Sequence, residues 1–250
     1  MTPLDVTRSL MESASIEAQV CIKCGSRSLG LCAPLGAEGL HDMAGETERF
    51  GLEPREVLFH QGDRSRYVYT LTSGTARLIR VLSDGRQAAI GFRFAGDMLG
   101  YTSGEEYLFG AEAEAAITVC RMERKRLEEM FQRYPVLDRR FRELAAQELA
   151  ASQDHIMALG RFTAEERVAA FLLVLIEAQE RRGRTGPVFE LPATRADIGE
   201  FLGLTLETVS RAISAFRKRG WIRLHGHSGI ELTDRTALMG LGSGDGADAA

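Results

Sequence analysis

One stretch near the carboxyl end, residues 194–218, constrains the fold of this chain more than any other. Thr194 can cap a first helix whose apolar residues recur at helical spacing, and Thr205 can cap a second one. Gly203 stands between them, where a tight turn requires the positive φ that glycine adopts at little steric cost. Two short capped helices joined by such a turn predict a helix-turn-helix.

The exposed face of the second predicted helix carries side chains that can read base edges. Arg211 can make a bidentate contact with guanine, Glu207 can accept from the cytosine amino group, and Ser210 can bond to a base or a phosphate. Two more residues of this face, Thr205 and Thr208, are also predicted to contact DNA. The basic residues predicted to contact phosphates are Arg217, Lys218, Arg219 and Arg223. A helical hairpin with a solvated charged face is the alternative, but it leaves the caps, the turn glycine and the basic run unrelated.

The flanking segments extend this motif into a domain. Thr163-Ala-Glu-Glu166 is a capping box that starts a helix upstream, and residues 221–232 contain two short apolar runs that predict a β-hairpin wing. We therefore predict a winged helix-turn-helix over residues 161–240. The Gly-, Ala- and Asp-rich residues 241–250 are predicted to form a disordered tail.

Residues 51–134 have a different pattern, of short alternating runs separated by turn residues. The predicted strands are Glu56–His60, Tyr67–Thr72, Thr75–Leu82, Gln87–Phe94 and Ala115–Met122. Ser83-Asp84-Gly85 between two such runs is a hairpin signal. Strands of this length and spacing predict a small jelly roll, or β-roll, and hence an α+β chain.

Between these blocks the sequence predicts a short helix that ends before Pro135 and a long helix over residues 135–160. Beginning at Leu137, the long helix carries a heptad-like stripe made of Phe141, Leu144, Ala145, Glu148, Leu149, Ser152, Ile156 and Leu159. Because no second helix matches it in length, the stripe is predicted to be a seam between two copies of the chain. Packing of the stripe on the β-roll is the alternative.

The chain contains four cysteines in a three-plus-one arrangement. Cys21, Cys24 and Cys32 lie close together in residues 1–50, which are predicted to form an N-terminal arm, and Cys120 stands alone far downstream. Four thiolates match the ligand count of an iron–sulfur cluster or of a structural zinc ion. A zinc ribbon would more typically contain two close cysteine pairs, so the spacing favours a cluster and leaves zinc and thiol redox chemistry open.

Bulk properties exclude several other classes of protein. The net charge of −4 argues against a generally basic nucleic-acid coat and leaves room for a local basic surface. The chain has no long apolar run and no signal peptide, so we expect a cytoplasmic protein with reduced thiols and no membrane contact. Its histidines show no metal or triad spacing and no nucleotide motif is present, so no enzyme is expected, with a redox enzyme as a remote alternative.

The order of β-roll, long helix and winged helix-turn-helix resembles the CRP/FNR family of bacterial transcription regulators, and within it the FNR branch. Glu207-Thr-Val-Ser210-Arg211 is similar to the E-x-x-S-R recognition signature of that branch, and the cysteine pattern is similar to its cluster ligands. Two further segments, Glu165–Phe171 and Asp197–Thr205, are also similar to family segments.

The resemblance implies an oxygen-responsive regulator of anaerobic or microaerobic genes. Its cofactor would be a [4Fe–4S] cluster held by the four cysteines, and the intact cluster would stabilise a homodimer on a two-fold double-stranded DNA operator resembling TTGAT-N4-ATCAA. Oxygen would degrade the cluster and dissociate the dimer. The turn at Asp84 and Gly85 resembles a loop that contacts RNA polymerase, although an ordinary hairpin tip fits equally well.

Two departures and one rival complete the comparison with the family. The spacing from Cys24 to Cys32 is longer than in the best-known enterobacterial members, and Ser152 stands where the branch often has an acidic residue. The rival is a CRP-like regulator that responds to another ligand, to zinc or to thiol oxidation. A cyclic nucleotide is not expected, because no arginine occurs from Thr102 to Val119 to neutralise its phosphate.

Overall fold

The computed structural model describes residues 19–183, 186–226 and 228–243, and the chain divides into two compact units. Among the described residues, the first unit comprises those up to 85 and 92–147, and the second comprises 86–91 and those from 148 onward. None of the helices in the described part of the chain is both long enough and apolar enough to span a membrane.

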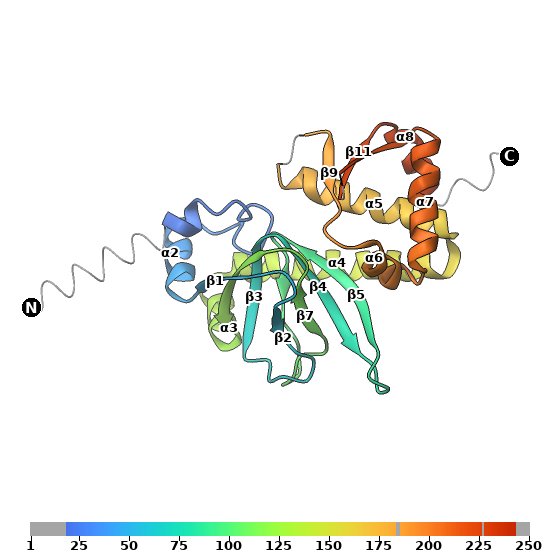
Figure 1. The fold of residues 1–250 in the computed structure, drawn as a ribbon. Helices are drawn as coiled ribbons and strands as arrows, with labels where there is room; N and C mark the ends of the chain where they lie inside the picture. The colour runs from blue at the N-terminus through green and yellow to red at the C-terminus, as the bar shows by residue number, and fades with distance from the viewer. Residues whose placement is uncertain (1–18, 184–185, 227, 244–250) are drawn as a thin grey trace, which may run out of the picture. The chain divides into compact units, whose positions relative to one another are not determined.

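The first unit is built on a β-roll of two four-stranded sheets (Figure 1), which confirms the predicted fold. The sheets have the strand orders β1-β8-β3-β6 and β2-β7-β4-β5. Their strands are β1 (Glu48–Leu52), β2 (Val57–Phe59), β3 (Tyr67–Ser73), β4 (Thr75–Val81), β5 (Gln87–Phe94), β6 (Met98–Leu99), β7 (Gly110–Ala113) and β8 (Ile117–Glu123). Sequence analysis missed β1, β6 and β7. Strand β7 reads Gly-Ala-Glu-Ala, without the β-branched or aromatic residues that mark a strand.

The interior of the roll is filled with aromatic and aliphatic side chains. The ring of Phe59 lies 4.1 Å from that of Tyr107 and 5.4 Å from that of Tyr69, measured between centroids. The Tyr107 hydroxyl donates to the carbonyl of Tyr67 at 2.8 Å. A cavity of only about 10 Å³ remains beside Tyr107. The side chains of these three rings therefore fill the centre of the roll.

A second core forms on the outer face of the sheet that contains β1 and β8. Successive residues of a strand point to opposite faces, so Val119 packs inside the roll while Cys120 and Met122 face outward. The loop around residues 21–35 and helix α2 (Ala37–Gly45) cover this face. The part of the predicted arm that is described, from residue 19 onward, is therefore folded onto the roll. Residues 1–18 lie outside the described residues.

Two helices follow the roll: α3 (Arg124–Arg133) and α4 (Pro135–Arg161). Tyr134 between them has a non-helical backbone, as Pro135 predicted. The first turns of α4 pack on their own chain. Leu137 is fully buried in the outer core, and Phe141 lies between the rings of Tyr101 and Phe131 at 4.5 and 5.1 Å.

The second unit contains the predicted winged helix-turn-helix (Figure 1). Its elements are α5 (Ala164–Arg181), β9 (Val188–Glu190), α6 (Arg195–Leu202), α7 (Leu206–Lys218), β10 (Ile222–His225), β11 (Gly229–Leu232) and α8 (Arg235–Gly242). The three strands pair in the order β10-β11-β9. Helix α8 was not predicted and extends into the segment expected to be a tail. Residues 244–250 lie outside the described residues.

Each predicted local signal of the helix-turn-helix is confirmed. Thr163 and Glu166 form a reciprocal capping box, and Thr205 accepts a hydrogen bond from the backbone N–H of Thr208. Gly203 adopts φ 64° at the end of α6. Gly199 adds a constraint that the sequence did not reveal, because a Cβ there would lie 2.7 Å from the carbonyl oxygen of Leu204.

Candidate metal centre and nucleic-acid interface

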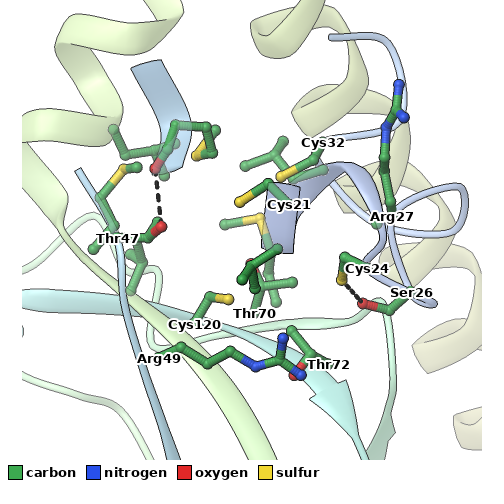
Figure 2. A pocket seen from close by; sticks show the side chains of 18 residues that line it. Cys21, Cys24, Ser26, Arg27, Cys32, Thr47, Arg49, Thr70, Thr72 and Cys120 are labelled. Atoms are coloured by element: carbon green, nitrogen blue, oxygen red, sulfur yellow. Dashed lines mark hydrogen bonds between the residues drawn. The ribbon is translucent and has the colours of Figure 1, made fainter. Parts of the chain in front are cut away.

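The four cysteines line one cavity of about 60 Å³ on the outer face of the roll (Figure 2). Cys120 is supplied by β8, and Cys21, Cys24 and Cys32 are supplied by the loop that covers it. The rest of the lining is largely apolar and includes Leu31, Met43, Val68, Met98, Met122 and Leu127. Residues that are far apart in sequence therefore converge on one site, in which all four cysteines are half-buried.

A close backbone approach holds the loop against the roll. A Cβ on Gly30 would lie 2.8 Å from the carbonyl oxygen of Gly96, and one on Gly96 would lie 2.8 Å from the Cβ of Leu29. Neither contact leaves space for a side chain, so a glycine on each side is required here. This contact fixes the loop two residues before Cys32.

Burial sets the protonation of two of the thiols. Removal from water, together with the neighbouring cysteines, raises the pKa of Cys32 to about 12, and the nearby Arg27 guanidinium opposes this shift. The same causes raise the pKa of Cys120 to about 11, opposed by Arg49. Cys24 differs in that its sulfur lies 3.2 Å from the hydroxyl of Ser26. Without a bound metal, Cys32 and Cys120 are neutral thiols at neutral pH.

The arrangement of the sulfurs separates two kinds of metal centre. Within the described ranges, no three His, Cys, Asp or Glu side chains stand close enough together to hold a single metal ion. A structural zinc ion would draw four ligands to within about 2.3 Å of one point. The cysteines surround a cavity instead, and a polynuclear cluster takes thiolate ligands around its periphery. Four thiols around one cavity are therefore a donor set that fits an iron–sulfur cluster.

Arg140 links the cysteine loop to helix α4, a contact that the sequence gave no means to find. Its guanidinium donates to the carbonyl of Leu29 at 2.7 Å and to that of Gly30 at 3.3 Å. It also pairs with Glu143 one turn along the same helix. The long helix is thus bonded directly to the segment that carries Cys32.

The predicted DNA-reading residues lie together on α7. Val209, Ile213 and Phe216 are fully buried, and Glu207 and Arg211 are exposed. The remaining members of the set are Thr205, exposed at the cap, Thr208 and Ser210, half-buried on the helix, and Arg217 and Lys218, exposed in its last turn.

Short hydrogen bonds order the amino-terminal end of α7. The Thr205 and Thr208 hydroxyls lie 3.0 Å apart, and Arg211 donates to the Thr208 hydroxyl at 3.3 Å. A backbone hydrogen bond and the Thr205 hydroxyl lower the pKa of Glu207, so this carboxylate is charged and accepts hydrogen bonds at neutral pH.

The basic residues after α7 divide into two groups. Arg219 pairs with Glu165 at 2.6 Å and lies over the ring of Trp221, and Arg223 makes two 2.9 Å bonds with Glu231. The carboxylates therefore partly neutralise the positive charges of Arg219 and Arg223. The sequence predicted phosphate contacts for all four basic residues and gave no sign of these two ion pairs. Arg217 and Lys218 form no such ion pair within the part of the chain that the structure describes.

The predicted seam of α4 also divides into two parts. Phe141 and Leu144 pack half-buried against the outer core of the first unit, as in the alternative in which the stripe packs on the β-roll. The reason is the break at Pro135, which sets the first turns of α4 against the roll. Further along, Leu149 and Ile156 are 61% and 69% exposed. Ala145, Glu148 and Ser152 are exposed and Leu159 is half-buried, and the Ser152 hydroxyl donates to the carbonyl of Glu148 at 2.9 Å.

Two further contacts in the second unit escaped the sequence analysis. Arg167 donates to the carbonyls of Leu159, Phe162 and Leu202, and so joins the end of α4 to the turn of the helix-turn-helix. The ring of His155 stacks on that of Phe201 at 4.1 Å.

Asp84 and Gly85 form an exposed hairpin tip between β4 and β5, with Gly85 at φ 84°.

Comparison with known proteins assigns both halves of the chain. Residues 49–134 match the cyclic nucleotide-binding domain family, and residues 166–241 match the Crp-like helix-turn-helix domain family. The nitrogen fixation regulation protein FixK of Bradyrhizobium diazoefficiens is 35% identical over 221 residues, 88% of this chain and 93% of that protein. The transcriptional activator protein FnrL of Cereibacter sphaeroides is 31% identical over 223 residues, 88% of this chain and 90% of that protein. The solved structure of FixK2 from Bradyrhizobium japonicum superimposes with a TM-score of 0.71 at 36% identity, covering 78% of this chain and 96% of that one.

The fold and the recognition helix define a DNA-binding transcription regulator. The chain belongs to the CRP/FNR family, whose Crp-type members bind double-stranded DNA as dimers. Its relatives include both FixK and Fnr proteins, so the signal to which this chain responds has to be argued from its own residues.

Proposed function

We propose that this regulator is of the oxygen-responsive FNR type and that Cys21, Cys24, Cys32 and Cys120 hold a [4Fe–4S] cluster. One observation carries the proposal: four cysteines from two segments that are distant in sequence line a single, largely apolar cavity. When bound, the cluster would supply a centre that oxygen can destroy. The loop residues would orient three ligands, and β8 would orient the fourth.

The response would reach the DNA through helix α4. Arg140 ties the loop that carries Cys32 to α4, so a change in the loop changes the contacts of this helix. The exposed Leu149 and Ile156 would form the seam with a second copy. A dimer presents two α7 helices to a two-fold operator, whereas one half-site alone gives only part of the binding energy. Cluster loss would therefore weaken DNA binding by weakening the dimer.

Two rival signals receive less support from the same residues. A thiol redox switch requires low-pKa, accessible thiolates, and burial raises the pKa of both Cys32 and Cys120. A cyclic nucleotide would have to enter a roll whose interior is occupied by Phe59, Tyr69 and Tyr107. RNA polymerase contact through Asp84 and Gly85 is a further part of the proposal that rests on the exposed hairpin tip.

The test is anaerobic purification of the full-length protein, followed by iron and sulfide analysis, visible absorption and sedimentation. We expect iron and sulfide in equal amounts, a dimer that binds the operator, and loss of all three properties in air. Serine substitution of each cysteine in turn should abolish cluster binding, while Ser26→Ala should retain it. A colourless, zinc-containing protein, or a dimer unaffected by air, would contradict the proposal.

A further inference from the structure

Cys120 lies between two polar neighbours on the outer face of its sheet. Its cross-strand partner in β1 is Arg49, and its cross-strand partner in β3 is Thr70. Directly opposed residues on adjacent strands project to the same face, with Cβ atoms about 4.5–5.5 Å apart. The register therefore sets the side chains of Arg49 and Thr70 on either side of the Cys120 side chain. All three residues line the cysteine cavity (Figure 2).

Thr70 differs from the other threonines of the cavity in what its hydroxyl does. The Thr47 hydroxyl donates to the carbonyl of Met43 at 2.9 Å, and the Thr72 hydroxyl donates to the carbonyl of Thr118 at 3.0 Å. The Thr70 hydroxyl makes no hydrogen bond to any other described residue. Its proton is therefore available to a sulfur acceptor on the neighbouring strand.

Arg49 is likewise uncommitted. Its neighbour Glu48 pairs with Arg121, and Arg49 itself forms no ion pair with the residues that the structure describes. The other arginine of the cavity, Arg27, donates to the carbonyl of Leu35 at 3.1 Å. Arg49 is thus the guanidinium of this cavity that can turn toward a ligand.

We propose that Arg49 and Thr70 are positioning residues that stabilise negative charge on the Cys120 sulfur and thereby set the reduction potential of the cluster bound there. The inference rests on the proposed function. A thiolate-bound cluster gains negative charge when it accepts an electron, and hydrogen bonds or positive charge near its sulfurs favour that reduced form. Removing either group should therefore lower the midpoint potential.

The test is a one-electron titration with dithionite of the anaerobically reconstituted, full-length protein. Arg49→Gln and Thr70→Val are compared with the matched controls Arg66→Gln, an exposed arginine paired with Glu123 outside the cavity, and Thr72→Val. For Arg49→Gln we expect about a threefold change in the oxidised-to-reduced ratio at a fixed potential, the size of an exposed charge interaction. This corresponds to a downward shift of about 28 mV, from 59 mV per tenfold change for one electron.

The remaining outcomes separate this inference from the proposed function. Thr70→Val should shift the potential in the same direction, Thr70→Ser should restore it, and both controls should match the wild type. Equal iron and sulfide content shows that each variant loads its cluster. Loaded variants with the wild-type potential would overturn the roles of Arg49 and Thr70 alone. A wild-type protein that assembles no cluster would overturn the proposed function and this inference with it.

Discussion

The recognition helix and the cysteine cavity are assembled in opposite ways. Helix α7 is specified by groups that are close in sequence: the Thr205 cap, the left-handed Gly203 and an apolar face that begins at Val209. The cavity joins a loop to a strand far downstream and depends on the register that sets Cys120 beside Arg49. Substitution of a single side chain should therefore disrupt the recognition helix. The cysteine cavity should instead be disrupted by substitutions that break the contacts between its loop and the rest of the first unit.

The largest effect is expected from removing the central side chain of the local site. Phe216→Ala should lower the free energy of unfolding of the second unit by about 3–5 kcal/mol, because Phe216 is fully buried and its loss leaves a cavity. Trp221, the sole tryptophan, stacks on Phe216 and reports this transition by fluorescence during denaturation. Iron content at low denaturant should be unchanged. Simultaneous loss of the cysteine site would show that the two regions are not specified separately.

A smaller effect should separate base reading from phosphate binding on α7. Arg211→Ala should weaken specific operator binding by about 1–3 kcal/mol, because a bidentate contact with a base is lost. Lys218→Ala is the matched control, and it should weaken binding to all sequences. It should also reduce the slope of the logarithm of the binding constant against the logarithm of salt concentration by about one. Titration of operator and random duplexes at several salt concentrations measures both. Equal losses on the two duplexes for Arg211→Ala would contradict its assignment to base reading.

The tertiary site should respond to Arg140, which touches none of the cysteines through its guanidinium. Arg140→Gln removes the bonds to the carbonyls of Leu29 and Gly30 and should lower the amide exchange protection of the loop by about 1–2 kcal/mol. Arg142→Gln, which breaks only an exposed pair with Asp138, is the control. Hydrogen exchange of the metal-free protein measures the protection of the loop amides directly. Unchanged protection in Arg140→Gln would remove the proposed link between loop and α4.

The smallest expected effect is a pH dependence of the second unit. Burial lowers the pKa of His155 below its ordinary value near 6.5, so the folded unit holds this ring neutral where the unfolded chain would protonate it. The stability that the neutral His155 ring contributes to the folded unit is therefore complete above pH 6.5. It is lost as the pH falls from 6.5 to the lowered pKa of His155. Denaturation experiments between pH 5 and 8 give the free energy of unfolding at each pH. Its slope against pH should be shallower in His155→Gln than in the wild type. Identical slopes would exclude His155 as the source.

The two regions also differ in how far sequence reasoning reached. The caps at Thr163 and Thr205, the turn at Gly203 and the break before Pro135 were all predicted, because each depends on bonds within a few residues. Helix α2 was missed because its apolar residues pack on the outer face of the roll, and strand β1 was missed because Phe50 and Leu52 pack against the interior of the roll. Strand β7 lacked the residues that mark a strand.

For the candidate site, the sequence named all four cysteines and the reading face of α7, because residue type and spacing carry that chemistry. It could not show that the cysteines share a cavity, that Arg219 and Arg223 are paired with carboxylates, or that Phe141 packs on its own chain.

By itself, then, the sequence determined the order of the domains, the recognition helix and the set of candidate thiol ligands, since short-range periodicity, caps and residue chemistry are sufficient for these. Only the tertiary structure decided which groups flank Cys120 and which arginine bonds the cysteine loop to α4. The physical reason is that strand register and the packing of one layer on another depend on contacts between distant residues, which no local pattern records.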